Sequence, residues 1–99
     1  MKKDIATKII ATLGPASSSK SMVRKLIEAG VDIFRLNLSH GDFASHGLLI
    51  KNIRAVSKEL DVRTSIMIDL PGPKIRVGKL SEDPLILKRG NTIYLKSGP

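Results

Sequence analysis

The chain has 99 residues, 41% of them hydrophobic and 26% charged, which suffices for one small soluble domain with a modest core. It has no cysteine, which excludes a disulfide scaffold or a thiolate zinc site, and no apolar run approaches the roughly 18 residues of a membrane span. The net charge of +8 comes from scattered lysines and arginines without interleaved aromatic residues, so we expect anionic small molecules as partners rather than nucleic acid or membrane, in a cytoplasmic protein.

The first part of the chain predicts a strand, a helix and a second strand. Residues 6–13 (ATKIIATL) are β-branched and apolar, as in a strand. Ser19 or Ser21 can cap a helix, and Gly30 stands where such a helix would end in a left-handed residue. Residues 31–38 (VDIFRLNL) form the second strand. The apolar stripe of the helix comprises Met22, Val23, Leu26 and Ile27.

A turn at residues 40–42 leads to a longer helix over residues 43–60 and a third strand over residues 64–69. Strands that alternate with helices predict an α/β fold with a parallel sheet, which two helices can cover on one face only. The apolar stripe of the longer helix comprises Phe43, Leu49, Ile50, Ile53, Val56 and Leu60.

The last third of the chain differs in kind, because it has no helical pattern. Residues 75–80, 84–88 and 91–96 are short strand-like runs, and residues 89–91 (RGN) predict a hairpin loop between the last two. The order is therefore βαβαβ followed by all β structure.

Polar side chains gather where the second and third strands end. Alternation along the second strand puts Arg35, Asn37 and Ser39 on one face, and Asp69 ends the third strand. Both a (β/α)8 barrel and an open α/β sheet bind ligands at the carboxyl ends of their strands, so these residues are site candidates. Two plainer interpretations stay open: Arg35 pairs only with Asp69, and Asn37 and Ser39 cap the following helix.

Common nucleotide and hydrolase motifs are absent from the sequence. There is no GxGxxG, no GxxxxGK[ST] and no GxSxG. His40 and His46 are six residues apart, which is not the spacing of helical zinc ligands, so we expect His40 in a turn or cap and His46 at a partly buried helix position.

Three blocks of the sequence resemble the N-terminal signatures of the pyruvate kinase family. They are TKIIATLGPASSS (7–19), AGVDIFRLNLSHG (29–41) with His46 and IKNIR (50–54) downstream, and DLPGPKIRVG (69–78). The resemblance implies that residues 1–70 are the first part of a (β/α)8 TIM barrel. It also implies that residues 71–99 begin an inserted small β domain.

The resemblance implies a glycolytic enzyme that transfers the phosphoryl group of phosphoenolpyruvate to ADP. Arg35 matches the arginine that grips the substrate phosphate, which suits a guanidinium fork. Asn37, Ser39 and His40 match residues beside the nucleotide phosphates, and Arg76 matches an arginine that reaches them when the small domain closes. Full-length members are expected to be homo-oligomers.

A monovalent-cation site is implied as well, with Asn37, Ser39, Asp69 and the Leu70 carbonyl as its oxygen ligands. Potassium-dependent members commonly read DTKGPEIR where this chain reads DLPGPKIR, so Lys74 replaces a glutamate. A lysine ammonium carries the charge of K⁺, so Lys74 is a candidate substitute for that ion.

The family's Mg²⁺ ligands and its catalytic lysine come from later strands, which this chain does not contain. A (β/α)8 barrel needs about 250 residues. We therefore expect a truncated N-terminal portion that is inactive alone. The alternative is a freestanding, non-catalytic remnant that serves as a binding or interaction module, and a basic nucleic-acid binder ranks third.

Overall fold

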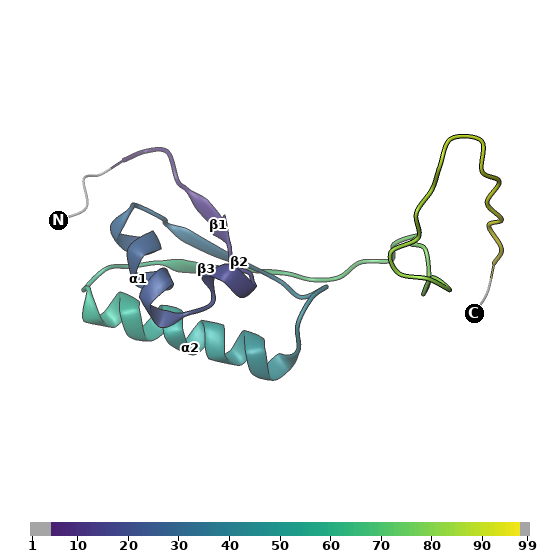
Figure 1. The fold of residues 1–99 in the computed structure, drawn as a ribbon. Helices are drawn as coiled ribbons and strands as arrows, with labels where there is room; N and C mark the ends of the chain where they lie inside the picture. The colour runs from purple at the N-terminus through teal and green to yellow at the C-terminus, as the bar shows by residue number, and fades with distance from the viewer. Residues whose placement is uncertain (1–4, 98–99) are drawn as a thin grey trace.

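The computed structural model describes residues 5–97, and all of its helices and strands precede residue 70 (Figure 1). The observed order confirms the predicted βαβαβ arrangement. A short 3-10 turn that the sequence did not suggest follows the first strand. The elements are β1 (Ile10–Thr12), η1 (Pro15–Ser17), α1 (Lys20–Glu28), β2 (Ile33–Asn37), α2 (Phe43–Glu59) and β3 (Ser65–Asp69). Residues 1–4 and 98–99 of the two predicted domains lie outside the described residues.

The three strands form one parallel sheet in the order β1-β2-β3. β1 is shorter than the predicted strand over residues 6–13, because its ladder with β2 begins only at Ile10, opposite Ile33. Just before it, the Asp32 carboxylate accepts a hydrogen bond from the Ile9 N–H at 2.9 Å. At the other end of the sheet, Asn37 pairs in register with Asp69. The carboxyl ends of β2 and β3 therefore meet at one edge.

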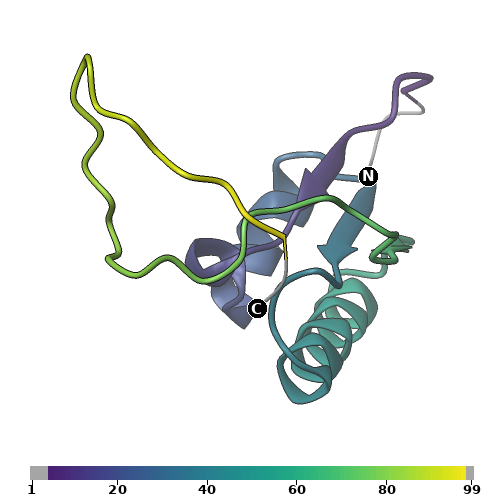
Figure 2. The same cartoon turned by 90° about the vertical axis from the view of Figure 1, so that its right-hand side faces the viewer.

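Both helices pack on the same face of the sheet, the face that carries Phe34 and Leu36 (Figures 1 and 2). Phe34 and Leu36 are almost fully buried beneath them. On the opposite face Ile10 is 51% exposed and Met67 is 40% exposed, so that face has no cover among the described residues. The core comprises Leu13, Val23, Ile27, Val31, Phe34, Leu36, Leu49, Ile53 and Val56.

The helix ends follow simple hydrogen-bonding rules. Ser19 caps α1 by accepting the Met22 N–H at 3.2 Å, so the first of the two predicted caps is the correct one. Gly30, with φ of +108°, ends α1 in the left-handed conformation, as predicted. Asp61 takes the same place after α2, with φ of +50°. Both ends are Schellman motifs, because the following residue donates back to the third-last helical carbonyl.

Polar contacts join the two helices on the outside. The Glu59 carboxylate, near the end of α2, forms ion pairs with Lys20 and Arg24 of α1. The side-chain hydrogen bond from Lys20 lowers the pKa of Glu59, helped by the charges of both cations. None of the helices in residues 5–97 is long and apolar enough to cross a membrane.

Two predictions about hydrophobic segments are wrong. Residues 70–97 are exposed and form no strand, although three strand-like runs were expected there. A strand needs a hydrogen-bonded neighbour, and these runs do not pair with one another. Of the predicted hairpin only the turn is present, where the Asn91 N–H donates to the Lys88 carbonyl at 3.0 Å. Phe43 is 94% exposed, because it opens α2 beyond the end of the sheet and reaches no part of the core.

Candidate functional site

Arg35 stands at the centre of the polar edge of the sheet. Alternation along β2 directs it to the face opposite Phe34, toward the uncovered side. Its Nη1 donates to Thr12 Oγ1 of β1 at 3.1 Å, and its Nη2 forms an ion pair with Asp69 of β3. The guanidinium thus bridges all three strands. It has five N–H groups, so it can hold these partners and still donate to a bound anion.

The ion pair between Arg35 and Asp69, which was one of the interpretations of the sequence, is therefore present. Its side chains are 33% and 42% exposed, so the pair contributes at most about 1 kcal/mol to stability. Thr12 was not predicted as a site residue. It could have been found, because it is the last residue of β1 and lies in register with Arg35.

Asn37 and Ser39 shape the loop that follows β2. The Ser39 N–H donates to Asn37 Oδ1 at 3.0 Å, and the His40 N–H donates to the Asn37 carbonyl at 3.3 Å. The interpretation of Asn37 and Ser39 as caps of the next helix is wrong, because Asp42 caps α2 instead.

Asp42 and Ser45 form a reciprocal capping box at the start of α2. Asp42 Oδ1 accepts the Ser45 N–H at 2.8 Å, and the Asp42 N–H donates to Ser45 Oγ at 3.0 Å. The Ser45 backbone N–H is the main cause that lowers the pKa of the exposed Asp42 carboxyl, followed by the Ser45 hydroxyl. This box fixes the point at which the loop becomes helix.

His40 and His46 meet across that loop, which the sequence did not predict. His46 Nε2 lies 2.5 Å from the His40 carbonyl oxygen, while His46 Nδ1 is buried without a hydrogen-bond partner in the described structure. His46 is half-buried on α2, as expected, but a spacing of six residues gives no signal for this contact.

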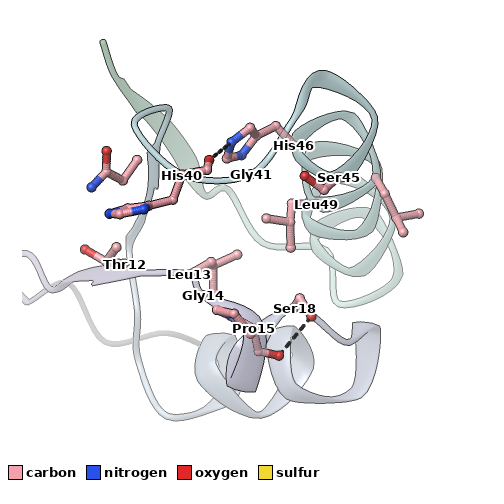
Figure 3. Close-up of a pocket in the computed structure, with 12 residues that line it drawn as sticks. Thr12, Leu13, Gly14, Pro15, Ser18, His40, Gly41, Ser45, His46 and Leu49 are labelled. Carbon is pink, nitrogen blue, oxygen red and sulfur yellow. Dashed lines mark hydrogen bonds between the residues drawn. The ribbon is translucent and has the colours of Figure 1, made fainter. Parts of the chain in front are cut away.

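A hollow of about 690 Å³ lies between the β1–η1 segment and the loop after β2 (Figure 3). His40 lines one side of it, Gly14 and Pro15 line the other, and Asn37 is also among the lining residues. Leu49 lines it from α2. The hollow adjoins the polar edge of the sheet, because Thr12 and Asn37 belong to both.

The structure does not bring the remaining candidates into this group. Leu70, Lys74 and Arg76 lie in the exposed segment that leads away from the sheet (Figure 1). Within residues 5–97, neither Lys74 nor Arg76 has an ion pair. Asp69 pairs with Arg35 rather than with Lys74.

The oxygen atoms at the carboxyl edge of the sheet are of the type that binds a hard monovalent cation. The Asn37 amide and the Asp69 carboxylate carry oxygen atoms, the type of donor that such a cation prefers, on two residues paired in register. Residues 5–97 contain no group of three or more His, Asp or Glu side chains placed to share a metal ion.

A family model described as the barrel domain of pyruvate kinase matches residues 4–98. The chain belongs to the pyruvate kinase family. A pyruvate kinase of Agrobacterium vitis is 54% identical over 87 residues, and one of Thermococcus litoralis is 45% identical over 89 residues. These alignments cover 88% and 90% of this chain but only 18% and 19% of the two relatives. The chain therefore spans about a fifth of the length of the curated pyruvate kinases it matches.

The solved structures agree with this assignment. A pyruvate kinase from Cryptosporidium parvum superposes with a TM-score of 0.64 and 41% identity, over 68% of this chain and 14% of that one. The parallel α/β sheet is thus part of a pyruvate kinase barrel domain. The start of an inserted β domain after residue 70 stays a prediction.

Proposed function

We propose that the chain contributes part of the active site of a cytoplasmic pyruvate kinase, which forms pyruvate and ATP from phosphoenolpyruvate and ADP. The observation that carries the proposal is the Arg35–Asp69–Asn37 group at the carboxyl edge of a sheet that belongs to this family. In the reaction, the bond between phosphorus and the enol oxygen breaks while a bond to the terminal phosphate oxygen of ADP forms. The enolate left behind then takes a proton at carbon to give pyruvate.

Arg35 would bind the phosphoryl group of phosphoenolpyruvate. Two strands flank β2 and fix the guanidinium through Thr12 and Asp69, so little side-chain freedom is lost when the substrate binds. Such a fixed positive charge can stabilise a transferring phosphoryl group without further reorganisation. Asn37, Ser39 and His40 would face the nucleotide phosphates beside it, and Arg76 would join them from the segment after β3.

The monovalent cation would sit among Asn37, Ser39, Asp69 and the Leu70 carbonyl, where it would offset the negative charge of the two substrates. Lys74 would supply that charge in place of K⁺ once the segment after β3 is held near the sheet. Mg²⁺ would be bound by residues beyond this chain and would neutralise the phosphates. The catalytic lysine would also come from elsewhere, so the 99-residue chain alone should form no pyruvate.

A chimeric enzyme tests the proposal directly. The homologous segment of the Agrobacterium vitis pyruvate kinase is replaced by residues 1–99, and pyruvate formation is followed with phosphoenolpyruvate, ADP and Mg²⁺. Activity is expected, and Arg35→Gln should lower kcat/KM for phosphoenolpyruvate by about 10- to 100-fold, the value of one charge-assisted hydrogen bond. Arg63→Gln is the matched control, because Arg63 is an exposed arginine at the opposite end of β3.

An inactive but folded chimera would favour the alternative, a remnant that binds without catalysis. Equal losses in the Arg35 and Arg63 variants would show that the charge at the sheet edge has no special role. Pyruvate formation by the 99-residue chain alone would contradict the expectation that the remaining barrel is required.

A further inference from the structure

We propose that His46 is a positioning residue that holds the loop of residues 38–42, and with it His40, against the hollow. The proposal rests on the proposed function for one point only, the role of this loop in nucleotide binding. The starting observation is the 2.5 Å contact between His46 Nε2 and the His40 carbonyl oxygen (Figure 3).

The contact assigns the proton on the imidazole. A carbonyl oxygen can only accept a hydrogen bond, so Nε2 must carry the hydrogen. Nδ1 is buried without a hydrogen-bond partner in the described residues. The opposite tautomer would leave an N–H group buried at Nδ1 and two acceptors facing each other at Nε2. Of the two neutral tautomers of His46, the site therefore favours the one with the hydrogen on Nε2.

The backbone of His46 is held in place by the helix that carries it. His46 lies in the first turn of α2, directly after the Asp42–Ser45 capping box. Gly41 lets the loop pass close to it, with φ of +77°. A Cβ atom at Gly41 would lie 3.1 Å from His46 Nε2 and 3.0 Å from Ser45 Oγ. A side chain at this position would require Ser45 or His46 to shift, so glycine suits this approach.

Both backbone polar groups of His40 consequently form hydrogen bonds. Its N–H donates to the Asn37 carbonyl at the end of β2, and its carbonyl accepts from His46 on α2. These two bonds tie the peptide groups of His40 to the sheet and to the helix. The His40 side chain, which lines the hollow, takes its direction from that backbone.

Glutamine and asparagine provide matched substitutions. The amide nitrogen of His46→Gln can occupy the place of Nε2 and donate to the His40 carbonyl, whereas the shorter His46→Asn places its amide near Nδ1 and cannot reach it. In the chimeric enzyme, His46→Asn should raise the KM for ADP about fivefold to tenfold, the value of one hydrogen bond. His46→Gln should stay within about twofold of the unmodified chimera. The KM for phosphoenolpyruvate, which Arg35 would bind, should change little in either variant.

Nuclear magnetic resonance of the 99-residue chain supplies a second measurement that does not need activity. The ¹⁵N shifts of His46 should show the Nε2–H tautomer, and the amide signals of residues 39–41 should move in His46→Asn but not in His46→Gln. An Nδ1–H tautomer, or equal loop shifts in both variants, would overturn the proposal. So would equal increases in the two KM values. If the unmodified chimera were inactive, the proposed function would fail and these spectra alone would decide the role of His46.

Discussion

Gly41 and Gly47 allow the loop after β2 to be tested with one chemical change at two places. Gly41 has φ of +77°, and an added Cβ would lie 3.0 Å from Ser45 Oγ and 3.1 Å from His46 Nε2. Gly47 lies inside α2, and an added Cβ there would meet nothing within 4 Å. Replacement by alanine should therefore change stability in opposite directions.

The magnitudes follow from separate terms. Alanine in the left-handed region costs about 1–2 kcal/mol, and displacing Ser45 from the capping box costs about 1 kcal/mol more. Alanine also lowers the conformational entropy of the unfolded chain, which stabilises the folded state by about 0.4–1 kcal/mol. Gly41→Ala should thus lower the free energy of unfolding by about 1–2.5 kcal/mol. Gly47→Ala should gain about 0.5–1 kcal/mol, because alanine is the better residue inside a helix.

Urea denaturation followed by circular dichroism at helical wavelengths measures both changes. In thermal denaturation followed by the same signal, the midpoints of the two variants should differ by at least about 6 °C for a domain of this size. A Gly41→Ala protein as stable as the unmodified chain would show that the loop can relax away from Ser45 and His46. A Gly47→Ala protein that is less stable would refute the view that this position is an open helical site.

Three further predictions concern a helix end, an ion pair and the cation site. Asp61→Gly should raise the free energy of unfolding, measured from the urea midpoint, by about 0.5–1 kcal/mol. Glycine accepts φ of +50°, and the substitution removes a negative charge that is unfavourable at a helix C-terminus. Asp61→Asn removes the charge alone and so measures its share of the effect. The pKa of Glu59 is lowered in the folded chain, so its stabilisation is present above the ordinary glutamate pKa and is lost as pH falls below about 5. Urea midpoints measured from pH 7 to pH 3 should consequently fall less in Glu59→Gln than in the unmodified chain, and parallel curves would contradict this. The chimeric enzyme should work without K⁺, and Lys74→Glu should make it depend on K⁺; a hundredfold loss of rate in the unmodified chimera that K⁺ restores would disprove the role of Lys74.

The sequence predicted those elements whose signals are local. Ser19 and Gly30 mark the ends of α1 through hydrogen bonds within one turn, so a pattern of neighbours suffices to find them. The polar ends of β2 and β3 were also predictable, because alternation fixes the face of Arg35 and a parallel sheet aligns strand ends. The Arg35–Asp69 pair follows from these two rules together.

Other features depend on atoms distant in the sequence or on partners. The His40–His46 contact arises because a glycine turn carries the backbone under an imidazole, and residue spacing does not show this. The runs after residue 70 have strand composition, but composition does not provide a hydrogen-bonded neighbour. Phe43 fits the helical period of α2, yet the sheet beneath it has already ended.

The strand order β1-β2-β3 has a consequence for the timing of folding. Each strand pairs with the one made just before it, so no strand must later be inserted between two that are already joined. A ribosome adds roughly 5–20 residues per second, so the stretch from Ile10 to Asp69 takes about 3–12 s to emerge. A helix forms in about a microsecond. The sheet can therefore grow strand by strand at the pace of translation, and each new strand meets an edge that is already in place.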